Sequence, residues 1–282
     1  MVLTNRDLKL FKLISTTAIL STEQIQNRVF KNIAKVTVLR RLRKLERGKY
    51  ISKVLGLPGF KAAWHLTLKG AGVIGVENIK RNFHPLNLVH DTRLNGLRFI
   101  LEDQGISRSW IPEHEIRSKM ARKHGLRLMK SQSVPDGIMG VKNKGAMESV
   151  AIELELHYKN KDRYKQIFNS YSQKKNIFAV WYLVLTKPHG RHLEKIWKDV
   201  TGYYSGSSLL WSEVSDVEKN GAKARLYFRD KMYLVEDVFI PKSLEVPAQE
   251  AGSGLSREMK KNIEVESDLN ARKEKEILAE VS

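Results

Sequence analysis

Hydrophobic positions at helical spacing predict three short helices at the start of the chain. The first covers residues 5–18, and Asn5 is available as its N-cap. A capping-box pattern, Ser21 followed three residues later by Gln24, begins the second helix. The third covers residues 35–47, where leucines recur on one side and basic residues occupy the other faces. The chain therefore begins with a small helical unit.

The pattern then changes to one that predicts two strands joined by a tight turn. Residues 50–55 and 61–68 are expected to be strands, and Gly-Leu-Pro-Gly at residues 56–59 is a strong turn signal. Three short helices followed by a hairpin make a winged helix-turn-helix. Residues 36–51 are similar to the recognition helix and first wing strand of many bacterial winged-helix proteins.

Helical and strand patterns alternate through the remainder of the chain as far as residue 240. A helix that carries His90 and Asp91 is expected from Leu86 to near Gly105. These two residues could serve a site, but an amphipathic helix that docks the two domains is the more ordinary explanation. Strands are expected at residues 110–116, 133–139, 150–157, 176–186 and 209–214, helices at residues 162–175 and 191–204, and a terminal hairpin within residues 223–240. This order predicts an α/β (α+β) fold with a mixed sheet and flanking helices.

These elements divide the chain into four parts. A winged helix-turn-helix is expected over residues 1–76, a connecting helix region over 77–105, and an α/β domain over 106–240. Residues 241–282 begin with Pro, Gly and Ser and become dense in Lys and Glu, which is typical of a flexible charged tail or of an exposed marginal helix.

Positive charge is concentrated in the first of these parts. The 282 residues carry 50 Lys and Arg against 31 Asp and Glu, a formal net charge of +19. Residues 1–83 hold 17 basic and four acidic residues, a difference of +13, and the remaining residues hold 33 and 27, a difference of +6. The simplest interpretation is a dedicated polyanion-binding unit followed by a unit in which acidic and basic residues are nearly equal in number. A winged helix makes duplex DNA the expected polyanion.

The third predicted helix supplies the candidate DNA contacts. A helix in the major groove needs short polar or basic side chains near its start to reach base edges, and flanking basic groups to hold phosphates. The candidates on this helix are Lys35, Thr37, Arg40, Arg41 and Lys44, and the candidates on the wing are Lys53 and Lys61. The alternative is that these residues form a solvated face of a protein-interaction module.

Two acidic residues share one face of the strand predicted at residues 150–157. Alternation places Glu153 and Glu155 on the same face, where their carboxylates repel one another. They are expected to face solvent or to surround a cation, and Asp136 on a neighbouring strand could complete an oxygen site for Mg²⁺.

The succession of Pro135-Asp136, a strand with Glu153-Leu154-Glu155, a helix and a buried strand resembles the core of the PD-(D/E)xK nuclease superfamily. More narrowly, residues 1–215 resemble the replication-relaxation family of bacterial plasmids and mobile elements. The matching positions are the winged helix, His90-Asp91, Trp110 with Glu113, Pro135-Asp136-Gly137, Glu153 with Glu155, and residues 161–171. The resemblance implies a role in plasmid replication, mobilisation or transcriptional control.

In the nuclease pattern the two acids hold a divalent metal, and a Lys two residues after the Glu stabilises the charge that develops on oxygen. Asp136 and Glu153 match the acids, but position 155 is Glu rather than Lys. Lys159, or Lys165 and Lys174 from the following helix, could take the role of the missing lysine. The resemblance therefore leaves two alternatives, a degenerate nuclease-like domain and a Mg²⁺-dependent endonuclease or nickase targeted by the winged helix.

Several other classes of chemistry are excluded by residues that the sequence lacks. Cysteine is absent, which removes disulfides, thiolate metal sites and cysteine nucleophiles. No Walker-type phosphate loop, HExxH or G-x-S-x-G motif is present, and no apolar run is long enough for a signal peptide or a membrane span. We expect a cytoplasmic DNA-binding protein, a homodimer, with replication or mobilisation proteins as further partners and no membrane association.

Overall fold

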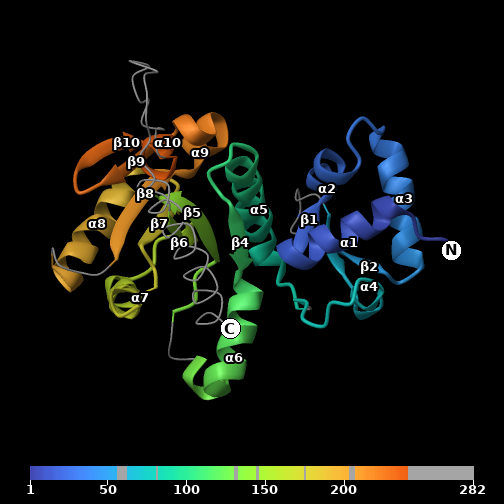
Figure 1. The fold of residues 1–282 in the computed structure, drawn as a ribbon, viewed down its shortest axis with the longest axis horizontal. Helices are drawn as coiled ribbons and strands as arrows, with labels where there is room; N and C mark the ends of the chain where they lie inside the picture. Colours follow the sequence, from blue (N-terminus) through green and yellow to red (C-terminus); the bar gives the residue numbers. More distant parts are fainter. Residues whose placement is uncertain are drawn as a thin grey trace, which may run out of the picture.

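The computed structural model describes residues 1–55, 62–80, 82–129, 133–143, 146–174, 176–202 and 207–240. The predicted turn at residues 56–59, the candidate Lys61 and the predicted tail at residues 241–282 lie outside this part of the chain. Within it the chain forms a small helical unit and a larger α/β unit, and one long helix lies between them (Figure 1).

The first unit contains four helices and a three-stranded antiparallel sheet of order β1-β3-β2. Its elements are α1 (Asn5–Thr17), β1 (Ile19–Ser21), α2 (Thr22–Val29), α3 (Lys35–Arg47), β2 (Ile51–Val54), β3 (Ala63–Leu66) and α4 (Leu68–Val73). The three helices and the two hairpin strands were predicted, and α3 has the predicted bounds; β1 and α4 were not predicted.

Both capping boxes in this unit are local, which is why they define the helix starts so sharply. The predicted pair in α2 is confirmed, since Gln24 N–H donates to Ser21 Oγ at 3.1 Å and Ser21 N–H donates to the Gln24 side chain at 3.0 Å. In α1 the cap is Thr4 rather than the predicted Asn5, and its partner is Asp7. Asp7 thereby stabilises the first turn of the helix from inside the fold.

The second unit is a seven-stranded mixed sheet of order β10-β9-β8-β7-β6-β5-β4, in which β6, β7 and β8 are parallel. This confirms the predicted α/β class. Its elements are η1 (Pro85–Asn87), α5 (Leu88–Asp103), β4 (Ser109–Pro112), α6 (Glu113–Met129), β5 (Gly137–Asn143), β6 (Ala146–Glu155), α7 (Lys161–Ser172), β7 (Ala179–Val184), α8 (Lys187–Thr201), β8 (Ser208–Glu213), α9 (Val214–Asn220), η2 (Gly221–Lys223), β9 (Arg225–Phe228), β10 (Lys231–Leu234) and α10 (Val235–Phe239).

Helices cover both faces of this sheet. Helices α5, α9 and α10 pack on one face, and α7 and α8 pack on the other (Figure 1). Every residue of the central strand β7 is consequently buried, as its continuous apolar run predicted. The strand predicted at residues 110–116 is shorter than expected: β4 ends at Pro112, and Glu113 and Glu115 lie in the first turn of α6. Among the described residues, no helix has the length and apolar character needed to cross a bilayer.

Helix α5 joins the two units through buried polar contacts. Asn95 donates from its amide to the carbonyls of Thr17 at 3.0 Å and Ile19 at 2.7 Å. Arg98 donates to the carbonyl of Thr16 at 2.9 Å, and Phe99 belongs to the core of the first unit. Helix α5 thus contacts both units through its side chains, and its role in docking two domains stays a prediction.

Arg41 was predicted to contact DNA, but the structure turns it inward. Its guanidinium donates from Nε to Asp7 Oδ1 at 2.9 Å and from a second nitrogen to Asp7 Oδ2. The Asp7 side chain is only 1% exposed. Burial raises the pKa of Asp7, but the hydrogen bonds from Arg41 and Thr4 outweigh burial and hold it below its usual value. Arg41 thus stabilises a buried charge in the fold.

We expect Arg41→Ala to lower the free energy of unfolding of the first unit by about 3 kcal/mol, because it leaves the Asp7 carboxylate buried without its cation. The matched control is Arg40→Ala, which removes an exposed guanidinium from the adjacent position and should change stability by less than about 0.5 kcal/mol. Urea unfolding followed by circular dichroism measures both. Equal stability of the two variants would contradict the structural role of Arg41.

Candidate nucleic-acid interface and carboxylate cluster

The exposed face of α3 is a row of cations. Val38, Leu42 and Leu45 bury the opposite face in the core of the first unit. The helical period places four exposed basic residues around the outward direction, and we call them the α3 basic face: Arg40, Arg43, Lys44 and Arg47. Sequence analysis selected two of them and missed Arg43 and Arg47, although their spacing from Arg40 by three and seven residues was a sufficient signal.

The start of α3 carries the shorter candidates. Lys35 and Thr37 are both exposed in the first turn, and Lys35 Nζ lies 3.6 Å from a Glu23 carboxylate oxygen. Because both partners are about half exposed, this ion pair is weak and can exchange for a phosphate contact. Val36 between them is 63% exposed, which is unusual for a large apolar side chain.

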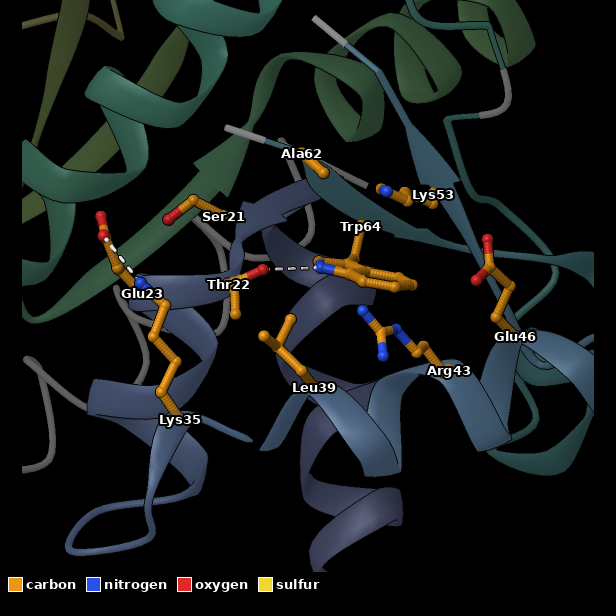
Figure 2. Close-up of a pocket in the computed structure, with 10 residues that line it drawn as sticks. All are labelled: Ser21, Thr22, Glu23, Lys35, Leu39, Arg43, Glu46, Lys53, Ala62 and Trp64. Atoms are coloured by element: carbon orange, nitrogen blue, oxygen red, sulfur yellow. Dashed lines mark hydrogen bonds and ion pairs between the residues drawn. The ribbon is translucent and has the colours of Figure 1, made fainter. Parts of the chain in front are cut away.

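A hollow lies between α3, α2 and the small sheet (Figure 2). Trp64 forms its floor and donates from Nε1 to Thr22 Oγ1 at 2.9 Å. Figure 2 shows Arg43 extending towards Trp64 and Lys53 of β2 at the rim. Leu39, which was predicted to be buried with the other leucines, instead lines this hollow and is partly exposed. The hollow is therefore lined by basic residues from both β2 and α3, Lys53 and Arg43.

A separate cluster of ionisable groups lies where α5 meets β5 and β6. Asp136 directly precedes β5, and its Oδ2 accepts hydrogen bonds from Leu154 N–H at 2.8 Å and from His90 Nε2 at 3.2 Å. The other ring nitrogen of His90 lies 3.2 Å from Asp91 Oδ1, and Lys80 donates to the second oxygen of Asp91 at 2.8 Å. His90 thus bridges two carboxylates.

This arrangement keeps His90 protonated. Burial lowers the pKa of His90, but its hydrogen bonds and charge interactions with Asp136 and Asp91 outweigh burial and raise that pKa to about 10. Both ring nitrogens face carboxylate oxygens, and an imidazole can donate from both only when it carries two protons. His90 is therefore an imidazolium at neutral pH and links α5 to the start of β5.

The prediction that Glu153 and Glu155 share a face is confirmed, and both carboxyls are engaged by donors from α7 or the loop before it. The Tyr171 hydroxyl donates to Glu153, and Lys159 Nζ donates to Glu155. Burial and the nearby Asp136 carboxylate raise the pKa of Glu153 to about 8, so that Glu153 is mostly protonated at pH 7. Opposite it in β7, the buried Tyr182 hydroxyl has no hydrogen-bond partner in the described part of the chain.

The three predicted metal ligands do not fit a divalent cation in this arrangement. A hard cation such as Mg²⁺ needs ionised carboxylates directed at one point. Asp136 and Glu155 each face a cationic side chain, and burial together with the Asp136 carboxylate raises the pKa of Glu153. Across the residues that the structure describes, no three Asp, Glu or His side chains form a group that could hold a metal ion.

The candidate replacement lysines are also accounted for. Lys159 is bound to Glu155, and Lys165 lies 3.4 Å from the exposed Asp162. Lys174 donates to the carbonyl of Ser133 at 2.7 Å, and burial lowers its pKa. The cluster is consequently a set of internal ion pairs and hydrogen bonds that joins α5, β6 and α7.

The pKa shifts in this cluster predict that stability falls as the pH rises from about 6 to 10. An unfolded His loses its proton near pH 6.5, whereas folded His90 keeps it to about pH 10, so its stabilising contribution disappears over that interval. Glu153 acts in the same direction, because the unfolded carboxyl ionises near pH 4.5 and the folded one near pH 8.

His90→Gln and Glu153→Gln should therefore each flatten this pH dependence, and His157→Gln, which changes an exposed His, should leave it as in the parent. Urea unfolding at pH 6, 8 and 10 measures the slope. A parent protein of constant stability over this range would refute the assignment of these protonation states.

Comparisons with known proteins identify no family for this chain. No family model matches it, and no curated protein is similar enough to count as a match. The solved structures of the restriction endonuclease FokI bound to DNA and of FokI alone are similar at 10% and 13% identity, each with a TM-score of 0.26. Each match covers 78% of this chain and 46% of the FokI chain, so the chain spans about half of FokI. A TM-score this low does not establish a common fold, and the resemblance to the replication-relaxation family gains no support from a family match.

Proposed function

We propose that this protein binds duplex DNA through α3 and the β2–β3 hairpin. The observation that carries the proposal is the α3 basic face, whose four cations are exposed and form no ion pair with another described residue. Surface cations without acidic partners attract a polyanion strongly, because binding releases its condensed counterions. The excess of +13 in residues 1–83 gives the whole unit the same preference.

The shape of the unit favours duplex DNA among polyanions. An α-helix fits the major groove, and the 13-residue α3 stands at the edge of the unit with its apolar side anchored behind it (Figure 1). Thr37 and Val36 lie at its start, where a recognition helix contacts base edges. The exposed Val36 is suited to contact a thymine methyl group. Lys53 on the wing would then contact the phosphate backbone.

The second unit supports the first in this proposal and performs no hydrolysis. Asp136 is bound to His90 of α5, Glu153 accepts from Tyr171 of α7, and Glu155 is paired with Lys159. The sequence resemblance favours a role in replication, mobilisation or transcriptional control of a plasmid or mobile element. A homodimer, and partner proteins from one of these processes, stay predictions of the sequence.

The test of DNA binding is the double variant Arg40→Ala/Arg43→Ala. Loss of two phosphate or base contacts should weaken duplex affinity by roughly 10-fold or more at about 0.15 M salt and reduce the slope of log affinity against log salt by about 2. Fluorescence anisotropy with a labelled duplex measures both quantities. The matched control is Lys219→Ala/Lys223→Ala, which removes two exposed cations from the second unit. Unchanged duplex affinity in the α3 variant would disprove the proposal.

The endonuclease alternative is tested separately with supercoiled plasmid in Mg²⁺ or Mn²⁺. Because the carboxylates are engaged by His90, Tyr171 and Lys159, we expect no nicking at any ratio of protein to DNA. Asp136→Ala should then differ from the parent only in stability. Metal-dependent nicking that disappears in Asp136→Ala would instead establish the endonuclease.

A further inference from the structure

A second cationic surface lies on the α/β unit, at the end opposite α5. Residues 157–165 carry four Lys and Arg residues and one Asp, and residues 187–195 carry three Lys and Arg residues and one Glu. The two segments together have a formal charge of +5. Three of the seven cations are paired with acids, Lys159 with Glu155, Lys161 with Asp199 and Lys165 with Asp162. The cations that form no ion pair with another described residue are Arg163, Lys187, Arg191 and Lys195. They belong to the start of α7 with its preceding loop and to the first half of α8, which pack against each other (Figure 1).

An exposed aromatic ring lies within this surface. Tyr158 is 60% exposed, and one face of its ring stacks on His189 with 3.8 Å between the ring centroids and an angle of 17°. His189 is itself buried, and its Nε2 lies 3.0 Å from the Tyr164 hydroxyl. Burial and the neighbouring cations lower the pKa of His189 to about 4, so the supporting ring is neutral at physiological pH. Tyr158 is thus a supported platform with its outer side accessible.

Basic residues follow His189 along α8. His192 lies beside the Tyr158 ring at 6.1 Å between centroids, and Arg191 and Lys195, one turn apart on the same helix, are exposed on its outward side. Glu194, the acid nearest them in sequence, is directed elsewhere, because its carboxylate accepts hydrogen bonds from Trp211 Nε1 at 3.3 Å and from Asp230 N–H at 3.2 Å. The surface thus combines an exposed aromatic ring, supported by His189 of α8, with positive charge on the outward side of the same helix.

We infer that this surface binds single-stranded nucleic acid, with one unpaired base stacked on Tyr158 and the adjacent phosphates held by Arg191 and Lys195. A flat aromatic ring among cations matches the two features of a nucleic acid strand that every nucleotide repeats, a base with a π-face and a phosphate. The bases of a duplex are already stacked on one another, and a ring lying flat on the protein surface cannot reach them. Acidic peptides would use the cations but would gain nothing from the ring.

The experiment uses the full chain and a fluorescently labelled oligothymidylate, which forms no duplex. Tyr158→Ala should weaken binding roughly 5- to 100-fold, the range that loss of one base–aromatic stack produces, whereas Tyr158→Phe should stay within about twofold of the parent. Arg191→Ala/Lys195→Ala should also weaken binding and reduce the slope of log affinity against log salt by about 1.4. Because all three side chains are exposed, circular dichroism should show the variants folded as the parent.

Each variant is also titrated with duplex DNA, which separates this inference from the proposed function. Tyr158→Ala should retain duplex affinity, and Arg40→Ala/Arg43→Ala should retain affinity for oligothymidylate. The inference is overturned if the parent does not bind oligothymidylate or if Tyr158→Ala binds it as tightly as the parent. It is also overturned if polyglutamate competes equally well with the parent and with Tyr158→Ala, since the surface would then recognise charge alone.

Discussion

The burial of α5 on two sides is the constraint on which the rest of this structure depends. Leu94, Leu97 and Leu101 bury one side in the core of the α/β unit. The opposite side carries Asn95 and Arg98, whose polar atoms are buried against the first unit and bond to backbone carbonyls there. A buried polar group that lacks its hydrogen-bond partner lowers the free energy of unfolding by about 1–3 kcal/mol. The carbonyl partners of Asn95 and Arg98 are in place for one relative position of the two units. The orientation of α3 with respect to the sheet is consequently fixed by the side chains of α5.

The same physical reasoning explains why the acidic residues of this chain resemble a catalytic set without being arranged as one. A buried carboxylate needs a cation, a hydrogen-bond donor or a proton. Asp7 has Arg41, Asp136 has His90, Glu155 has Lys159, and Glu153 takes a proton beside Tyr171. Each of these contacts joins two elements that are distant in the sequence or separated by a turn. The acids therefore serve to join elements of the fold.

Much of the fold was predictable because its signals are local. The bounds of α3 follow from the leucine period, the capping box of α2 from a four-residue motif, and the shared face of Glu153 and Glu155 from strand alternation. In contrast, helix α4 was not predicted. It contains Gly70, where a Cβ atom would come within 2.1 Å of the Tyr50 carbonyl oxygen, and the need for glycine arises from this contact between distant residues.

The functional sites show the same division between local and distant causes. The α3 basic face could be derived from helical geometry, since Arg43 and Arg47 follow Arg40 at helical spacing. The inward orientation of Arg41 could not be derived in this way, because it is caused by Asp7, 34 residues earlier in the chain. The Tyr158 platform depends on His189, 31 residues later, and has no signature in the sequence around either residue. Sequence periodicity predicts which face a side chain occupies, but its partner is decided by packing.

These internal pairings also change the charge that a polyanion meets. The formal value of +19 counts His90 as neutral and Glu153 as ionised. In the folded chain at pH 7 His90 carries a proton and Glu153 is mostly protonated, so the net charge rises by close to two units. Arg41 and Lys159, by contrast, are each matched by a buried acid and contribute little to the outer field. The positive charge that a polyanion meets therefore comes from cations without acidic partners, which include the α3 basic face and Arg191 and Lys195 on α8. Since α5 fixes the relative position of the two units, a nucleic acid that contacts both surfaces must fit one fixed geometry.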